Sequence, residues 1–318
     1  MNAWIQQIES HLGVPLLPDL RELYEERDGE SPDGFRSHST SRAMRLMSAD
    51  EVIEYFDQLL TFANPHGSCQ FWMGGNREFA SAFLTGPLAG RVYIRDYDGR
   101  NDSISFRSVR SFVESMNELA AGDPKLNDWP DLATDYYVDS EYFYRGKAVC
   151  KPATEEEIAS DVEAARQLRA EYAAAENLDE PDEHHYAMNI MALIPPMATE
   201  EILEFLDSQD MWIQARACTI LGHRRYEPAT ARLGEIVRTG TTNGRGAALR
   251  ALGRLGTPAA LEQIVQSIGH YFKGGSRDLA DALAGCGCEI RKENIDPRNI
   301  QQPDYLYRLP GESEWRKV

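Results

Sequence analysis

A repeated pattern in the C-terminal part of the chain limits its possible folds more than any other feature of the sequence. Three nine-residue segments rich in alanine and leucine each end in glycine and align without gaps: 214–222, 245–253 and 277–285. The closing glycines are 31 and 32 residues apart, and in the first two copies a proline-containing turn and a second apolar helical stretch follow. Small residues at fixed positions let paired helices approach closely and stack. The pattern therefore predicts an all-α array of helical repeats over 184–318 that ends in an irregular tail.

The first 120 residues have mixed periodicity. Apolar residues recur at helical spacing in four stretches: 4–12, 17–24, 48–60 and 109–119. The third stretch begins with a capping box of Ser48 and Glu51. Between the third and fourth stretch, short strand-like runs alternate with glycine-containing turns: 71–73, 79–84, 92–94 and 104–106. This order predicts an α+β domain, in which helices flank an antiparallel meander.

The segment between these two parts is harder to classify. Aromatic residues alternate with carboxylates in 121–150, and Thr154 with Glu157 forms a capping box that begins a helix to about Glu176. Residues 177–183 are predicted to be an acidic linker, with His184 and His185 as solvated loop residues. The predicted domains are 1–150 (a core over 1–120 plus an acidic, aromatic extension), 151–183 (helix and linker) and 184–318 (repeats).

The net charge of −18 is concentrated in the middle of the chain. Residues 121–182 carry a net charge of −10, whereas residues 183–318 carry −1. Such a field repels nucleic acid and anionic membranes, and it speeds association with a basic protein. We therefore expect a basic protein partner and neither nucleic acid nor membrane binding, although acidity that serves only solubility is an equally good explanation of the charge alone.

Two further features concern the compartment. The chain has no secretory signal pattern at its N-terminus and no apolar run long enough to span a membrane. Its five cysteines are scattered, which argues against a disulfide framework. We expect reduced thiols and a cytoplasmic location.

Several motifs of the first 116 residues resemble those of the Smi/Knr-like (SUKH) superfamily. The opening Leu17-Pro18-Asp19-Leu20 to Asp28-Gly29 is similar to the family's start, with Asp28 where the family usually has Asn. The family's later progression is similar to four segments of this chain: 72–76, 86–92, 96–99 and 108–116. The repeats, in turn, resemble short HEAT-like repeats.

The resemblance implies an α+β domain whose bacterial members are mostly immunity proteins that neutralise a cognate toxin, often a nuclease, by direct binding. HEAT-like repeats imply a binding or dimerisation surface with no chemistry of their own. The expected function is therefore a bacterial immunity protein whose partner is a basic toxin domain. The alternative is an intracellular scaffold or regulator that binds proteins but no toxin, and the oligomeric state is not predicted.

The sequence lacks the motifs that are typical of catalysis and of metal binding. The sequence contains no Gly-x-Ser-x-Gly or His-Glu-x-x-His motif, and Gly74-Gly75-Asn76 lacks the Lys-Ser/Thr of a phosphate loop. Cys286 and Cys288 lie close in sequence, but no second Cys pair or His follows at zinc-finger spacing. We therefore predict no catalytic activity, no cofactor and no metal.

Candidate partner contacts are acidic and aromatic residues, because tyrosine and tryptophan are enriched in interface hot spots and carboxylates complement a basic surface. They comprise the following residues: Asp96, Asp98, Trp129, Asp131, Asp135, Tyr136, Tyr137 and Asp139. The competing interpretation is that these aromatics pack at the interface between the two domains.

Arg216, Arg245 and Arg277 recur at similar repeat positions, and we expect them to pair with carboxylates of neighbouring repeats rather than with nucleic acid.

Overall fold

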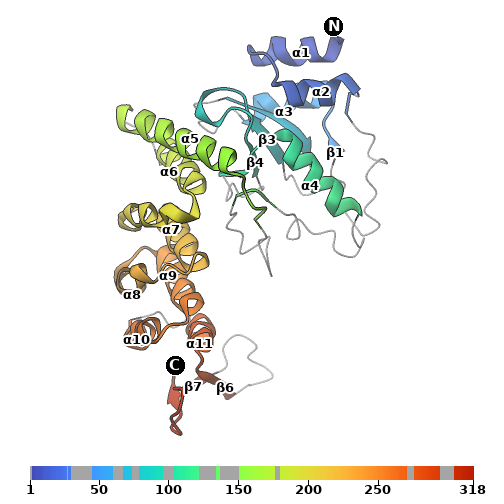
Figure 1. Cartoon of the computed structure of the whole chain (residues 1–318). Helices are drawn as coiled ribbons and strands as arrows, with labels where there is room; N and C mark the ends of the chain where they lie inside the picture. The colour runs from blue at the N-terminus through green and yellow to red at the C-terminus, as the bar shows by residue number, and fades with distance from the viewer. Residues whose placement is uncertain are drawn as a thin grey trace. The chain divides into compact units, whose positions relative to one another are not determined.

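The computed structural model describes most of the chain, in eleven stretches: 2–26, 28–29, 45–59, 67–73, 79–95, 103–121, 134–136, 150–175, 180–270, 276–293 and 304–318. By contacts the chain divides into two units, Met1–Pro195 and Pro196–Val318. Figure 1 labels most of their helices and strands.

The first unit is built on a five-stranded antiparallel sheet in the order β1-β2-β3-β4-β5. Its strands are β1 (Arg45–Leu46), β2 (Ser68–Met73), β3 (Phe79–Phe83), β4 (Val92–Arg95) and β5 (Ile104–Phe106). Neighbouring strands in the sheet are also neighbours in sequence, so the predicted meander is confirmed. The two-residue β1 was not predicted, because two residues carry no periodicity.

Four helices precede, interrupt or directly follow these strands in the sequence: α1 (Ala3–Leu12), α2 (Pro18–Glu26), α3 (Ala49–Leu59) and α4 (Val109–Ala121). They share one apolar core with a single face of the sheet. Phe112 of α4 meets the rings of Phe71, Trp72 and Phe106 edge-on, with centroids 5.3–5.6 Å apart. The α+β character predicted for this part of the chain is confirmed.

Asp28 and Gly29, which carry part of the family resemblance, follow α2 and contact the start of α3. Asp28 accepts a hydrogen bond from the backbone N–H of Ala49 at 2.8 Å. Gly29 has a φ of 76°, and a Cβ atom there would lie 2.9 Å from the backbone nitrogen of Ser48. The turn therefore needs glycine for both its conformation and its close approach. Ser48 and Glu51 complete the predicted capping box.

Two further helices, α5 (Glu155–Ala174) and α6 (Glu180–Leu193), belong to the first unit. Alternation along β3 places Ala80 and Ala82 in the core, and Phe83 meets the His185 ring of α6 at 5.6 Å. Asn189 of α6 accepts a hydrogen bond from the N–H of Ile104 at 3.0 Å. The predicted linker and solvated His185 were therefore wrong, because α6 already begins at Glu180 and His185 is 7% exposed.

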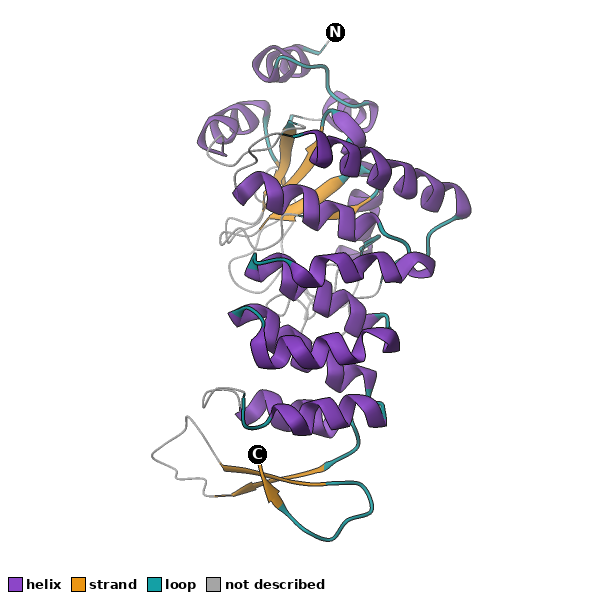
Figure 2. Cartoon of the chain, turned by 90° about the vertical axis from the view of Figure 1, so that its left-hand side faces the viewer, coloured by secondary structure: helices purple, strands orange, loops and turns teal. Residues whose placement is uncertain are grey.

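The second unit contains two rows of helices, which Figure 1 labels, and Figure 2 shows successive helices stacked one above another. One row contains α7 (Met211–His223), α9 (Thr242–Leu255) and α11 (Ser276–Gly285), and the other contains α8 (Thr230–Thr239) and α10 (Pro258–Ser267). A 3₁₀ segment, η4 (Pro196–Asp207), packs against α7. Gly222 and Gly253, which close the first two sequence copies, lie where adjacent helices touch. A Cβ atom there would be 2.7 Å from Ala251 Cα or 2.8 Å from Ala282 Cα.

The C-terminal tail was predicted to be irregular, and this was wrong. It forms a three-stranded antiparallel sheet of β6 (Glu289–Glu293), β7 (Asp304–Arg308) and β8 (Arg316–Lys317). Strand β7 packs against α11 and buries Tyr305 and Tyr307, two residues apart and hence on one face. Within the described residues, no helix is long and apolar enough to cross a membrane.

Candidate protein-binding sites

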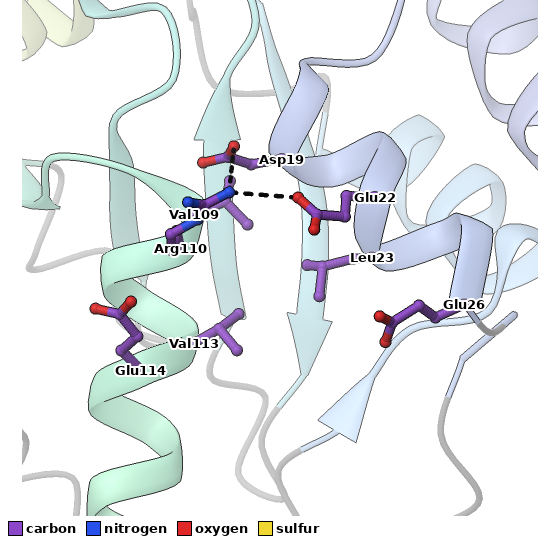
Figure 3. Close-up of a pocket in the computed structure, with 8 residues that line it drawn as sticks. All are labelled: Asp19, Glu22, Leu23, Glu26, Val109, Arg110, Val113 and Glu114. Atoms are coloured by element: carbon purple, nitrogen blue, oxygen red, sulfur yellow. Dashed lines mark hydrogen bonds and ion pairs between the residues drawn. The ribbon is translucent and has the colours of Figure 1, made fainter.

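A groove lies between α2 and α4 in the first unit (Figure 3). Its volume is about 300 Å³, and eight residues line it: Asp19, Glu22, Leu23, Glu26, Val109, Arg110, Val113 and Glu114. Four of these come from α2 at positions i, i+3, i+4 and i+7, which is one face of a helix. The result is an apolar floor with four carboxylates and one guanidinium around it.

Arg110 is the only cation among these lining residues. Its Nη2 atom lies 3.4 Å from Glu22 Oε2 and 4.0 Å from Asp19 Oδ1, and its side chain is 65% exposed. In Figure 3 these two contacts lie at one end of the groove, while Glu26 and Glu114 flank the other. Because one cation faces four carboxylates, the groove keeps a formal charge of −3.

Two of the eight sequence-predicted contact residues, Asp135 and Tyr136, are described, and both are buried (8% and 3% exposed). Asp135 Oδ2 accepts hydrogen bonds from the Arg107 N–H at 2.8 Å and the Ser111 hydroxyl at 2.6 Å. The carboxylate thus fixes the turn between β5 and α4 and does not face solvent. The other six lie outside the described residues and stay predictions: Asp96, Asp98, Trp129, Asp131, Tyr137 and Asp139.

Tyr136 belongs to a buried polar cluster around Asp161 of α5. Asp161 Oδ1 accepts from the Tyr136 hydroxyl at 2.5 Å and from Arg91 Nη2 at 3.1 Å, while Oδ2 accepts from Arg107 Nη2 at 2.9 Å. Burial raises the pKa of Tyr136 far above its ordinary value, so its hydroxyl stays protonated and donates. The cluster ties α5 to the sheet and to residue 136, all inside the first unit.

A polar side chain connects successive repeats in the second unit. In the first copy, Gln214 donates to the carbonyl of Leu206 at 2.9 Å and accepts from the N–H of Thr241 at 2.9 Å. Arg245, its counterpart in the next copy, donates to the carbonyls of Val237 and His270. Repeat arginines were expected to pair with carboxylates of neighbouring repeats. For Arg277 this was wrong, since it lies 3.8 Å from Asp281 of its own helix. For Arg216 and Arg245 it stays a prediction.

The cysteines have no visible role in a site. None of the five forms a disulfide, and burial raises the pKa of Cys69 and Cys218 to about 12, so both stay protonated at neutral pH. No three His, Cys, Asp or Glu side chains come together as a metal cluster within the described residues.

Comparison with known protein families matches residues 199–283 to HEAT repeats. The helical part of the second unit is therefore HEAT-like. The matched stretch runs from η4 to α11, which confirms the predicted HEAT-like region. It covers less than half of the chain and does not reach the first unit, whose similarity to the Smi/Knr-like family stays a prediction. No curated protein and no solved structure matches this chain.

Sequence reasoning missed the groove between α2 and α4. Asp19, Glu22 and Glu26 recur at helical spacing in the sequence, but an acidic helix face is also typical of an ordinary solvent-exposed surface. Which helix lies opposite depends on tertiary packing, because α2 and α4 are more than 80 residues apart in sequence.

Proposed function

We propose that this chain is a protein-binding protein with a basic partner, and specifically an immunity-type protein that neutralises a cognate toxin by direct binding. The HEAT-repeat match over 199–283 carries the proposal, because HEAT repeats generally mediate interactions between proteins. Stacked repeats offer extended surfaces with no catalytic group of their own.

The charge supports a basic partner. The whole chain has a net charge of −18, and the residues that line the groove between α2 and α4 contribute −3 of it. Complementary charge speeds the diffusional encounter and disfavours partners of the same sign. The immunity role rests on the resemblance of residues 17–116 to the Smi/Knr-like family.

The test is capture of partners from the native host with the tagged full-length chain, at moderate salt, followed by mass spectrometry. We expect a basic protein with a toxin-like domain to be retained. Its association rate with the purified chain should fall steeply as ionic strength rises, because screening removes electrostatic steering. Recovery of no protein, or of acidic proteins whose association is insensitive to salt, would contradict the proposal.

The predicted acidic contacts need a variant that spares the fold. Asp135 holds the start of α4, so its substitution would mix folding with binding. The double variant Asp131→Lys/Asp139→Lys leaves Asp135 intact, and we expect it to slow association and abolish protection against the toxin. Protection equal to that of the parent chain would exclude this segment as the contact.

A scaffold or regulator is the second candidate, favoured by the division of the chain into two units. One unit would then hold one partner and the HEAT repeats another. The two candidates differ in stoichiometry: two captured proteins that bind the chain together, without competition, favour the scaffold, whereas one toxin that protects cells when neutralised favours immunity.

A further inference from the structure

We propose that the groove between α2 and α4 binds a partner segment that presents an arginine or lysine beside an apolar side chain, with Arg110 as a built-in competitor for the same carboxylates. The inference rests on the proposed function only in taking the partner to be a protein.

The size of the groove limits its occupant. Its volume of about 300 Å³ lies at the lower end of the range for ligand pockets, roughly 300–1,000 Å³. It therefore accommodates one or two side chains. Val109 is buried and Leu23 and Val113 are half-buried, so they give the occupant an apolar floor on which to pack.

The chemistry of the rim selects a cation. Arginine and lysine have apolar stems and charged heads, so one side chain of either type contacts the floor and the carboxylates together. Within the described part of the chain, neither Glu26 nor Glu114 has a basic partner, and both are exposed at the end of the groove away from Arg110 (Figure 3). An incoming ammonium or guanidinium there finds two carboxylates that no cation of the described residues neutralises.

At the other end of the groove, the contacts of Arg110 indicate that Asp19 and Glu22 accept a cationic group. Its guanidinium already approaches Asp19 and Glu22, but at 4.0 and 3.4 Å and with 65% of the side chain exposed. Exposed ion pairs of this kind stabilise a fold by only about 0–1 kcal/mol. A partner cation that also buries an apolar neighbour can therefore displace Arg110 or share its carboxylates.

The test uses the full-length chain with labelled Leu and Val methyl groups, titrated at low salt with the peptide acetyl-Leu-Arg-Leu-Arg-amide. The methyl resonances of Leu23, Val109 and Val113 should shift. Arg110→Gln should tighten binding by about two- to fivefold, because it removes the competitor. Glu26→Gln/Glu114→Gln should weaken binding by about tenfold.

The matched control is Glu25→Gln/Glu118→Gln, which changes the same charge on the same two helices outside the groove. It should leave the affinity within twofold of the parent. Unshifted groove methyls, weaker binding by Arg110→Gln, or equal losses in the two double variants would each overturn the inference, the last because general electrostatic attraction then explains the binding.

The natural partner separates this inference from the proposed function. A captured basic protein that binds Glu26→Gln/Glu114→Gln as tightly as the parent leaves the proposed function standing and overturns the groove as its docking site. Binding of the peptide in the groove, with no protein captured from the host, supports the groove and counts against the proposed function.

Discussion

Arg225 is the one non-glycine residue with positive φ in the described part of the chain, at 49°. It lies two residues beyond the end of α7 and three residues after Gly222. Gly256 has positive φ at the equivalent place, three residues after Gly253, and Gly287 has positive φ two residues after Gly285. The left-handed conformation costs a residue with a Cβ atom about 1 kcal/mol. Arg225→Gly should therefore raise the free energy of unfolding by about 0.5–1 kcal/mol, measured by urea denaturation. The reciprocal Gly256→Arg should lower it, and a loss of stability in Arg225→Gly would mean that the arginine side chain makes contacts that outweigh its strain.

For single residues, interactions between neighbours in sequence could be predicted, whereas interactions with residues far away in sequence could not. Both predicted capping boxes are present, at Ser48 with Glu51 and at Thr154 with Glu157, because a capping box involves residues only three apart. Asp161 is one of several carboxylates in the sequence of α5. Its arginine partners are 54 and 70 residues away in sequence, so no local sequence pattern predicts that Asp161 is buried.

At the scale of elements, close stacking of the repeat helices depends on the closing glycines. Gly222→Ala and Gly253→Ala place a methyl group 2.7–2.8 Å from the next helix, so the helices must separate. We expect a loss of about 1–3 kcal/mol for each, as for other overpacked interiors. Gly269→Ala is the control, since a Cβ atom there meets nothing within 4 Å. Equal stabilities in urea titrations of the three variants would show that the rows are loosely packed.

Attachment of α5 to the sheet depends on the buried carboxylate of Asp161. Asp161→Ala leaves the guanidiniums of Arg91 and Arg107 without their shared partner, and their side chains are only 9% and 15% exposed. Removal of one member of such a buried group costs about 3–5 kcal/mol, to be measured by denaturant unfolding. Glu163→Ala, two residues along the same helix, removes a solvent-exposed ion pair with Arg166 and should leave stability unchanged. A similar loss in both variants would mean that helix propensity, and not the buried cluster, explains the effect.

Elements with a long periodic pattern were predicted, and the missed ones had misleading local composition. Glu180, Pro181 and Asp182 read as an acidic linker, yet acidic residues and proline are also what the first turn of a helix favours, and α6 begins there. The strand pair β6 and β7 was missed because its alternation is short: only Tyr305 and Tyr307 of β7 are buried. Packing of these tyrosines against α11 stabilises β7, and the sequence alone does not show that contact.

For the whole molecule, the sequence-based boundary at residue 150 and the contact-based boundary at residue 195 make different predictions. A fragment of residues 1–150 lacks α5 and α6, so it leaves Arg91 and Arg107 without Asp161 and exposes the face of Phe83. A fragment of residues 1–195 keeps the buried cluster, the contact of His185 with Phe83 and the hydrogen bond from Ile104 to Asn189.

We therefore expect residues 1–195 to unfold cooperatively in urea, and residues 1–150 to bind a hydrophobic dye and aggregate, because a buried ion cluster and an apolar face are both opened. Introducing Asp161→Ala into the longer fragment separates the two causes. A variant that stays monomeric but less stable assigns the aggregation of 1–150 to the exposed face, whereas a variant that aggregates assigns it to the unpaired arginines. Cooperative unfolding of 1–150 with the stability of 1–195 would place the boundary of the first folding unit where the sequence pattern put it.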